Sequence, residues 1–298
     1  MQRKVGADFG LAVRMVLTMF LLALVYLAFV GLLLRQGVQF GLIIPIVAVL
    51  LIAQYFYSDK LILLSLGARE VSEQQAPQLH DVVGRLAQMT GIPKPKVAII
   101  DTPVPNALAT GRNPKHAMVA VTTGILNQLE PRELEAVLAH EFSHVIHRDM
   151  RVMAMASFFA TVAAFIVQSS MWFGMGYEGG GNRRGGGNSY ILIVLASAAV
   201  WAISFVLIRT LSRYREFAAD RGSAIITGEP SALASALQKI SGRMQRIPSS
   251  DMRQMHSGNA LMIFPAISKG SIYEIFSTHP SLEHRLAKLQ DMEARLSR

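Results

Sequence analysis

The chain has 298 residues, of which 51% are hydrophobic and only 16% are charged, and its formal net charge is +9 at pH 7. This length would suit a soluble protein of two domains, but the apolar composition disfavours that class and indicates a membrane protein. The absence of cysteine excludes disulfides and leaves His, Asp and Glu as the side chains that can hold a metal ion.

The basic residues are spread along the chain and crowd near apolar segments. They do not form an aromatic-interleaved motif of the kind that binds nucleic acid, so we expect no nucleic-acid partner. Anionic lipid headgroups are the expected counter-charge.

Four apolar stretches are long enough to cross a bilayer, which takes about 20 residues. Residues 15–34 and 40–57 follow each other so closely that they must form an antiparallel hairpin, and residues 152–175 and 190–208 form a second pair. The first stretch is too long for the core of a signal peptide, so we expect it to remain as an anchor. The second pair has an alternative interpretation as a buried helical hairpin in a soluble core.

Lys and Arg gather on one side of these spans, which the positive-inside rule identifies as the cytoplasmic side. They are Arg3, Lys4, Arg14, Lys60, Arg69, Arg148, Arg151, Arg209, Arg213, Arg215 and Arg221. The other side has only Arg35, Arg183 and Arg184. We therefore expect both termini and the long polar segments in the cytoplasm.

The spans divide the chain into four expected parts. These are an N-terminal transmembrane hairpin at residues 1–57, a cytoplasmic part at 58–151, a second transmembrane hairpin at 152–208 and a second cytoplasmic part at 209–298. The loop 174–189 of the second hairpin is rich in glycine, a composition typical of flexible linkers.

The first cytoplasmic part has the patterns of a small α+β domain. Its apolar spacing predicts a helix over residues 77–89, and three short apolar segments predict strands at 96–100, 106–110 and 117–123. A turn between the last two strands is indicated by Gly, Asn and Pro in residues 111–115.

A further helix is expected to begin at Pro131, because proline is favoured in a first helical turn. No glycine or proline occurs between Arg132 and Phe173, so we expect this helix to run straight into the third span. The fourth span is expected to continue as a helix to Arg221. Helices over residues 231–240 and 281–296 follow in the tail.

The helix that begins at Pro131 carries the pattern H-E-x-x-H, as His140, Glu141 and His144. Residues four apart share one helix face, so the two His can each give a ring nitrogen to one Zn²⁺. Glu141 lies one step round the helix, where it can accept a proton from a water at the metal without being a ligand. The alternative is a buried amphipathic helix that carries these residues by chance, and a third ligand decides between the two.

Glu216 and Asp220 answer that requirement if the third and fourth spans form an antiparallel hairpin. Counted from the expected span ends, Glu216 is level with His144, and Asp220 with His140. We expect Glu216 to complete the ligand set, with one position left open as in catalytic zinc sites, and Asp220 to fix the tautomer of His140. Without the His pair nearby, both acids would be interpreted as a solvated helix face. His147 lies too far along its helix to share the ion with His140.

The sequence resembles the HtpX family of membrane-bound zinc metallopeptidases, which is related to the CAAX prenyl endopeptidases. The likeness covers nearly the whole chain and rests on four segments in the family's order. They are Pro105 to Gly111, close to the family's N-A-F-A-T-G with Leu108 in place of the usual Phe; His140 to His144; Glu216 to Asp220; and Thr278-His279-Pro280 followed by Arg285. The resemblance implies a mainly α membrane protein with four transmembrane helices and a cytoplasmic α+β, gluzincin-type protease domain with a small β-sheet.

The resemblance also implies roles for individual residues. His140, His144 and Glu216 correspond to the ligands of one Zn²⁺, and Glu141 to the general base. His279 and Arg285 would stabilise the oxyanion or order the site. The strand beside which substrate lies would be formed by Asn106, Ala107, Leu108 and Ala109.

The expected activity is that of a zinc metalloendopeptidase in the inner membrane of a bacterium. Its substrates would be cytoplasmic regions of misfolded or damaged membrane proteins and other unfolded polypeptides, as part of quality control under stress. One alternative is a prenyl-protein endopeptidase, which would need a large enclosed chamber and more than four spans. The other is a membrane scaffold with a structural zinc, against which Glu141 and the open coordination position argue.

Overall fold

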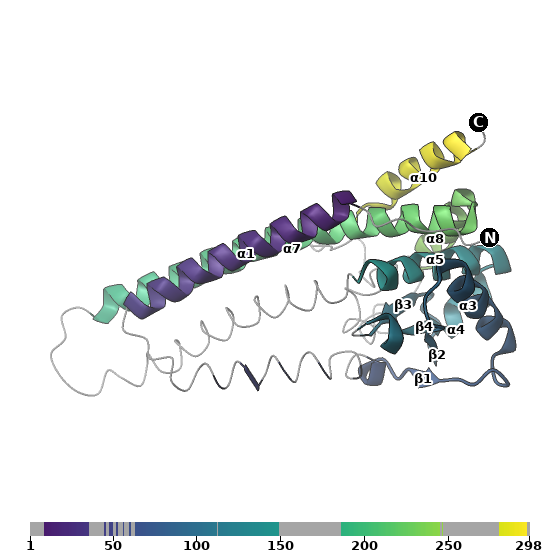
Figure 1. The fold of residues 1–298 in the computed structure, drawn as a ribbon, viewed down its shortest axis with the longest axis horizontal. Coiled ribbons are helices and arrows are strands. Elements are labelled where there is room, and N and C mark those ends of the chain that lie inside the picture. Colours follow the sequence, from purple (N-terminus) through teal and green to yellow (C-terminus); the bar gives the residue numbers. More distant parts are fainter. Residues whose placement is uncertain are drawn as a thin grey trace. The chain divides into compact units, whose positions relative to one another are not determined.

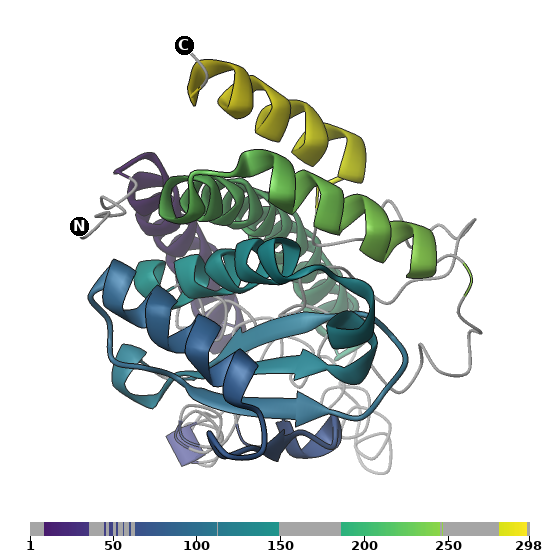
Figure 2. The ribbon, with the colours of Figure 1, turned by 90° about the vertical axis from the view of Figure 1, so that its right-hand side faces the viewer.

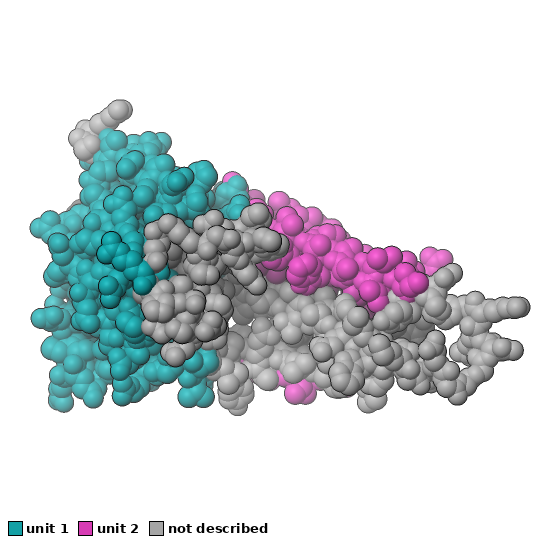
Figure 3. Space-filling view, turned by 180° about the vertical axis from the view of Figure 1, so that it is seen from behind, with its two compact units in different colours: residues 1–11, 57–151, 212–298 teal, residues 12–56, 152–211 magenta. Residues whose placement is uncertain are grey.

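The computed structural model describes residues 9–35, 63–111, 113–148, 186–244 and 280–296, with isolated positions at 45, 48, 49, 52, 56, 60 and 246. The chain separates into two compact units (Figure 3). Unit 1 combines residues 1–11, 57–151 and 212–298, and unit 2 combines residues 12–56 and 152–211.

Two of the four predicted spans lie largely or wholly outside the described residues. The span at 152–175 is not described, and the span at 40–57 is described only at isolated positions. Among the described residues, Phe9–Arg35 and Ile191–Thr227 are long and apolar enough to cross a membrane. These two helices correspond to the first and fourth predicted spans.

Unit 2 contains most of helix α1 (Phe9–Arg35) and most of helix α7 (Gly186–Thr227), which lie side by side (Figure 1). Phe29 and Leu33 of α1 pack with Val200 of α7 in a buried apolar cluster. The Tyr26 hydroxyl lies 3.2 Å from the Ser204 hydroxyl. Because hydrocarbon offers a hydroxyl no hydrogen-bond partner, this pairing suits a contact between two spans.

Unit 1 is built on a mixed sheet of four strands in the order β1-β2-β4-β3. The strands are β1 (Arg69–Glu70), β2 (Lys96–Ile100), β3 (Ala107–Thr110) and β4 (Met118–Thr122). β2 and β4 are parallel, whereas β3 and β1 pair antiparallel with β4 and β2. The three predicted strands are confirmed. β1 was missed because two exposed residues give no periodicity.

Helices cover the sheet in layers (Figure 2). The helices are α3 (Pro77–Thr90), α4 (Thr123–Gln128), α5 (Pro131–His147), α8 (Pro230–Met244) and α10 (Leu282–Leu296), with a short 3-10 turn at Pro114–His116. α5 contacts β3 and α3 on one side and α8 on the other, and α10 packs against α8. Among these helices, α5 has the most buried residues, and it carries the H-E-x-x-H pattern.

The predicted helix over 77–89 is confirmed, and its sequence explains both ends. Pro77 begins α3, and Gly91 closes it in a left-handed conformation with φ of 71°. The apolar face predicted from the spacing is the buried one, as Leu79 and Val83 show. The tail helices predicted over 231–240 and 281–296 are confirmed as α8 and α10.

Two predicted helix boundaries are wrong. α5 does not continue into the third span but ends at His147, where Arg148 adopts a left-handed conformation with φ of 56° and its N–H bonds back to Val145 O. The helix ends because Arg148 takes a left-handed backbone conformation, which costs a non-glycine residue energy. Arginine does not favour this conformation, so the sequence contains no sign of the helix end. α7 in turn continues past Arg221 to Thr227, and Gly228 ends it with φ of 76°.

Glu133 joins α5 to α8 through a buried carboxylate. It accepts hydrogen bonds from the Ser235 hydroxyl (2.6 Å) and from Lys239 Nζ (2.8 Å), and it caps the start of α5 by accepting from Glu130 N (2.9 Å). Burial alone would raise the pKa of Glu133, but Lys239 and Ser235 outweigh it and lower the pKa. This carboxylate is therefore held charged in the folded protein.

Replacing Glu133 with Gln is expected to lower the unfolding midpoint at pH 7 by about 5 °C, because an uncharged amide replaces the carboxylate that pairs with the Lys239 ammonium. A carboxyl whose pKa is lower in the folded state stabilises the fold above its unfolded pKa of about 4.3 and stops doing so as the pH falls through the folded value. The difference between wild type and variant should therefore shrink below about pH 4. Thermal unfolding at several pH values checks this. Asp81→Asn, in an exposed pair with Arg85, is the matched control and should change little.

Candidate metal centre

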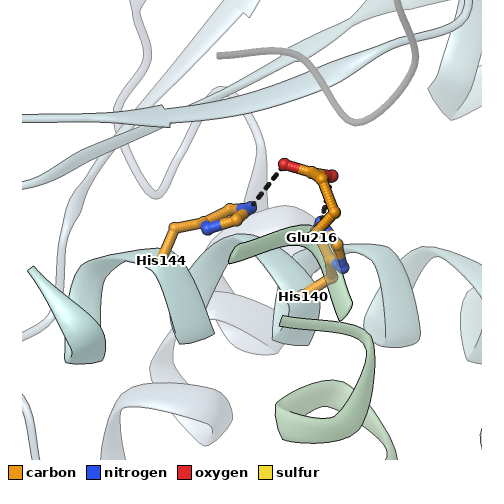
Figure 4. A group of neighbouring side chains, drawn as sticks. All are labelled: His140, His144 and Glu216. Carbon is orange, nitrogen blue, oxygen red and sulfur yellow. Dashed lines mark ion pairs between the residues drawn. The ribbon is translucent and has the colours of Figure 1, made fainter. Parts of the chain in front are cut away.

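α5 places His140 and His144 one turn apart on its buried face. Their rings lie edge to face with centroids 4.9 Å apart. His140 is fully buried and His144 nearly so. Figure 4 shows both side chains rising from α5 towards the same point, as the spacing of four predicts.

α7 supplies the third member of the group, Glu216. Its Oε2 lies 3.6 Å from His140 Nε2, and its Oε1 lies 3.6 Å from His144 Nε2 (Figure 4). One ligand atom of each residue lies within 4.8 Å of the other two. All three residues belong to unit 1.

These three side chains fit a zinc ion. Bonds of 2.0–2.1 Å in a tetrahedral site put neighbouring ligand atoms about 3.4 Å apart, close to the spacing found between His and Glu216. His140 Nε2 is buried and has no hydrogen-bond partner among the described residues, as befits an atom that serves as a ligand. Two nitrogens and one oxygen also form a donor set that zinc prefers, and the predicted ligands are confirmed as a group.

Asp220 supports His140 at Nδ1, the ring nitrogen that does not face Glu216, and Arg285 in turn holds Asp220. Asp220 Oδ1 lies 3.0 Å from His140 Nδ1. Arg285 donates to the same carboxylate twice, from Nε to Oδ2 (2.9 Å) and from Nη2 to Oδ1 (2.6 Å), and both residues are 2% exposed. Burial would lower the pKa of His140, but Asp220 and Glu216 outweigh it and raise the pKa to about 9.

Glu141 lies in the same buried region without belonging to the ligand group. It is 1% exposed, and burial raises the pKa of its carboxyl to about 8, with the charge of Glu216 adding to the rise. His140, the backbone N–H of Ala109 and Arg285 act in the opposite direction. Glu141 is thus a carboxyl with a high proton affinity beside a metal site, which is the property of a general base or acid.

The strand predicted to lie beside substrate is β3, the last strand of the sheet in the described part of the chain. Asn106 precedes it, and Thr122 N donates to Asn106 O (3.0 Å). Because hydrogen-bonded pairs alternate along an antiparallel ladder, Leu108 also turns its backbone polar groups to β4. The N–H and C=O groups of Ala107 and Ala109 therefore point to the outer edge, away from β4, and α5 packs against this strand.

Three other residues considered in the sequence analysis have different outcomes in the structure. His279 lies outside the described residues, so its role stays a prediction. Leu108 is 1% exposed and belongs to the apolar core. His147 is half-buried and is not a member of the ligand group, as its spacing predicts. The sequence analysis also missed Thr122, whose only local signal is its place as the N-cap of α4.

The chain is similar to known proteins over most of its length. The model of peptidase family M48 matches residues 73–293. The chain is 57% identical over 293 residues to a "Protease HtpX homolog" of Moorella thermoacetica, covering 98% of each chain. It is 56% identical over 297 residues to a "Protease HtpX homolog 2" of Methanosarcina acetivorans, covering 100% of each. The crystal structure of S. mikatae Ste24p has the same fold, with a TM-score of 0.54 and 18% identity, over 93% of this chain and 67% of that one.

Proposed function

The chain belongs to peptidase family M48 as a zinc-binding membrane metalloprotease homologous to HtpX, and we propose that it cleaves cytoplasmic regions of misfolded or damaged membrane proteins. The observation that carries the proposal is the buried group of His140, His144 and Glu216 in unit 1, which the chain joins to candidate membrane helices. A polypeptide that lies in or beside the same bilayer is the substrate that such a protein meets most often.

The candidate chemistry follows from the residues around this group. Zinc, when bound by His140, His144 and Glu216, supplies Lewis-acid activation of a carbonyl and a water. Glu141 accepts the proton of the attacking water and passes it to the leaving amine. Asp220 holds His140 so that its Nε2 stays directed at the ion, and Arg285 keeps Asp220 in place.

The outer edge of β3 is the proposed seat of the substrate. An extended peptide that pairs with Ala107 and Ala109 gains backbone hydrogen bonds whatever its side chains are, so its sequence preference is loose. The peptide would then lie against α5, which carries Glu141. Loose preference suits an enzyme that removes many different unfolded chains.

The remaining expectations complete the proposal. Four spans would anchor the chain, with both termini and the metal centre in the cytoplasm. The excess of Lys and Arg on one side of the spans supports this orientation and a contact with anionic lipid headgroups. His279 would assist at the oxyanion.

The test uses the full chain reconstituted in vesicles of anionic lipid. Because the chain has no cysteine, one exposed site such as Ser281→Cys reports its orientation through an impermeant maleimide. We expect cleavage of a single-span protein with an unstructured tail when that tail is on the side of Ser281, and none when the tail is on the other side. Cleavage of prenylated peptides alone would favour the prenyl-protein endopeptidase instead.

A further inference from the structure

Thr122 is a buried hydroxyl at the point where three elements of unit 1 meet. Its Oγ1 accepts a hydrogen bond from Asn106 N (2.8 Å) and one from Ile125 N (3.1 Å), and it donates to Asn106 O (3.1 Å). The residue is 1% exposed. One side chain therefore ties the start of β3 and the start of α4 to the end of β4.

The hydroxyl replaces one bond of the regular ladder. In an antiparallel hydrogen-bonded pair the two residues exchange both N–H to O=C bonds. Here Thr122 N donates to Asn106 O in the usual way, but Asn106 N donates to the Thr122 side chain. The orientation of the Asn106 peptide, and with it the start of the edge strand, thus depends on this hydroxyl.

A hydrogen bond between Asn106 and Ala107 links the Thr122 hydroxyl to the outer edge of β3. Asn106 Oδ1 accepts from Ala107 N (3.0 Å), which is one of the two outward-facing N–H groups of β3. A peptide that adds to this edge finds the Ala107 N–H bonded to Asn106 and the Ala109 N–H acting on the Glu141 carboxylate, so the Ala107 and Ala109 carbonyls are the groups left for pairing. Asn106, held by Thr122, therefore marks where pairing with an added strand can begin.

The surroundings leave this junction little freedom. Gly124 N donates to Thr102 O (2.9 Å), and the Thr123 hydroxyl donates to the same carbonyl (2.9 Å). A Cβ at Gly124 would come within 2.4 Å of Pro103 O, so the loop before β3 lies directly on the start of α4. A hydroxyl at position 122 is thus part of a closely packed joint.

We propose that Thr122 is a positioning residue that sets the register of the substrate strand on β3. The inference rests on the proposed binding of substrate along this edge. Loss of the hydroxyl frees the Asn106 peptide and the Ala107 N–H, so that an added strand can pair in more than one register. The catalytic groups on α5 and α7 stay as they are.

The experiment compares wild type, Thr122→Val, Thr122→Ser and Thr123→Val on an unstructured peptide of defined sequence. Thr122→Val keeps the shape and removes the hydroxyl, Thr122→Ser restores it, and Thr123→Val removes a neighbouring hydroxyl that does not bond to Asn106 or β3. For Thr122→Val we expect KM to rise about tenfold, the worth of one buried hydrogen bond, and cleavage to spread to neighbouring peptide bonds. Thr122→Ser and Thr123→Val should keep the wild-type KM and cleavage positions.

A purely structural role would give a different result. It would lower the active fraction and so kcat, with KM and the cleavage positions unchanged, and that outcome would overturn the inference. A second series separates this failure from failure of the proposed binding mode. Peptides with a single N-methyl group at successive positions should bind wild type weakly at every second position. If no such alternation appears, strand addition itself is refuted, whereas alternation with an unaffected Thr122→Val refutes only the role of Thr122.

Discussion

Glu141→Gln is expected to bind zinc as tightly as wild type and to lose between about 10² and 10⁴ of its kcat, the usual contribution of general acid and base catalysis. The side chain belongs to the helix that supplies two ligands but is not one of the three grouped donors. Glutamine has the same shape and cannot accept the proton of the water. The loss should therefore appear in turnover and leave the metal content and the fold unchanged.

The measurement is cleavage of an unfolded protein by the detergent-purified chain after chelation and return of Zn²⁺, with bound zinc counted in each sample. Glu135→Gln is the matched control, because Glu135 lies on the same helix outside the metal group and pairs with Arg85. It should cleave like wild type. Equal activity in Glu141→Gln and wild type would remove Glu141 as the base, and an empty site in the variant would make it a residue needed for metal binding instead.

The metal centre could be predicted from the sequence because its residues lie four apart on each of the two helices that carry them. Two residues four apart on each of two helices pair as His140 with Asp220 and His144 with Glu216. The premise used to find it was partly wrong, since α5 ends at His147 and does not enter the third span. The two pairs formed all the same, because an equal spacing of four on each helix lets the second pair form wherever the first one does.

The parts that sequence reasoning missed depend on contacts between distant segments. The left-handed turn at Arg148 contains no glycine, the residue from which such a turn is usually predicted. Thr122 was placed in the strand predicted over residues 117–123, and the helix α4 that it caps was not predicted. Only the folded sheet brings Asn106 to its hydroxyl. Arg285 was expected to stabilise the oxyanion or order the site, and the structure directs two of its nitrogens at one carboxylate 65 residues away.

The second large effect is expected from replacing Arg285, which should lower both stability and zinc affinity. Its guanidinium makes two hydrogen bonds to Asp220, and its Nη1 lies 3.9 Å from Glu216 Oε2. Burial would lower the pKa of Arg285, but Asp220 and then Glu216 and Glu141 raise it. The buried guanidinium of Arg285 thus stabilises the carboxylates of Asp220, Glu216 and Glu141.

Arg285→Met should therefore destabilise the protein by about 3–5 kcal/mol, the cost of leaving a buried charge without its partner. Zinc affinity should fall about 10- to 100-fold, because Asp220 would no longer be held against His140. Arg285→Lys should recover only part of both losses, since an ammonium cannot make the paired bonds of the planar fork. Denaturant unfolding and zinc titration against a competing chelator measure the two effects. Arg295→Met, which removes an exposed pair on the same helix, is the control.

The double variant Arg285→Met/Asp220→Asn distinguishes a positioning role from direct action on substrate. Asparagine carries no charge, so the double variant should regain most of the lost stability while its zinc affinity stays low. If instead Arg285→Met keeps wild-type stability and zinc affinity and loses only kcat, Arg285 acts on the oxyanion, and the two bonds to Asp220 are incidental. The geometry favours the first result, because two nitrogens of the fork already bond to Asp220 and the third lies near Glu216.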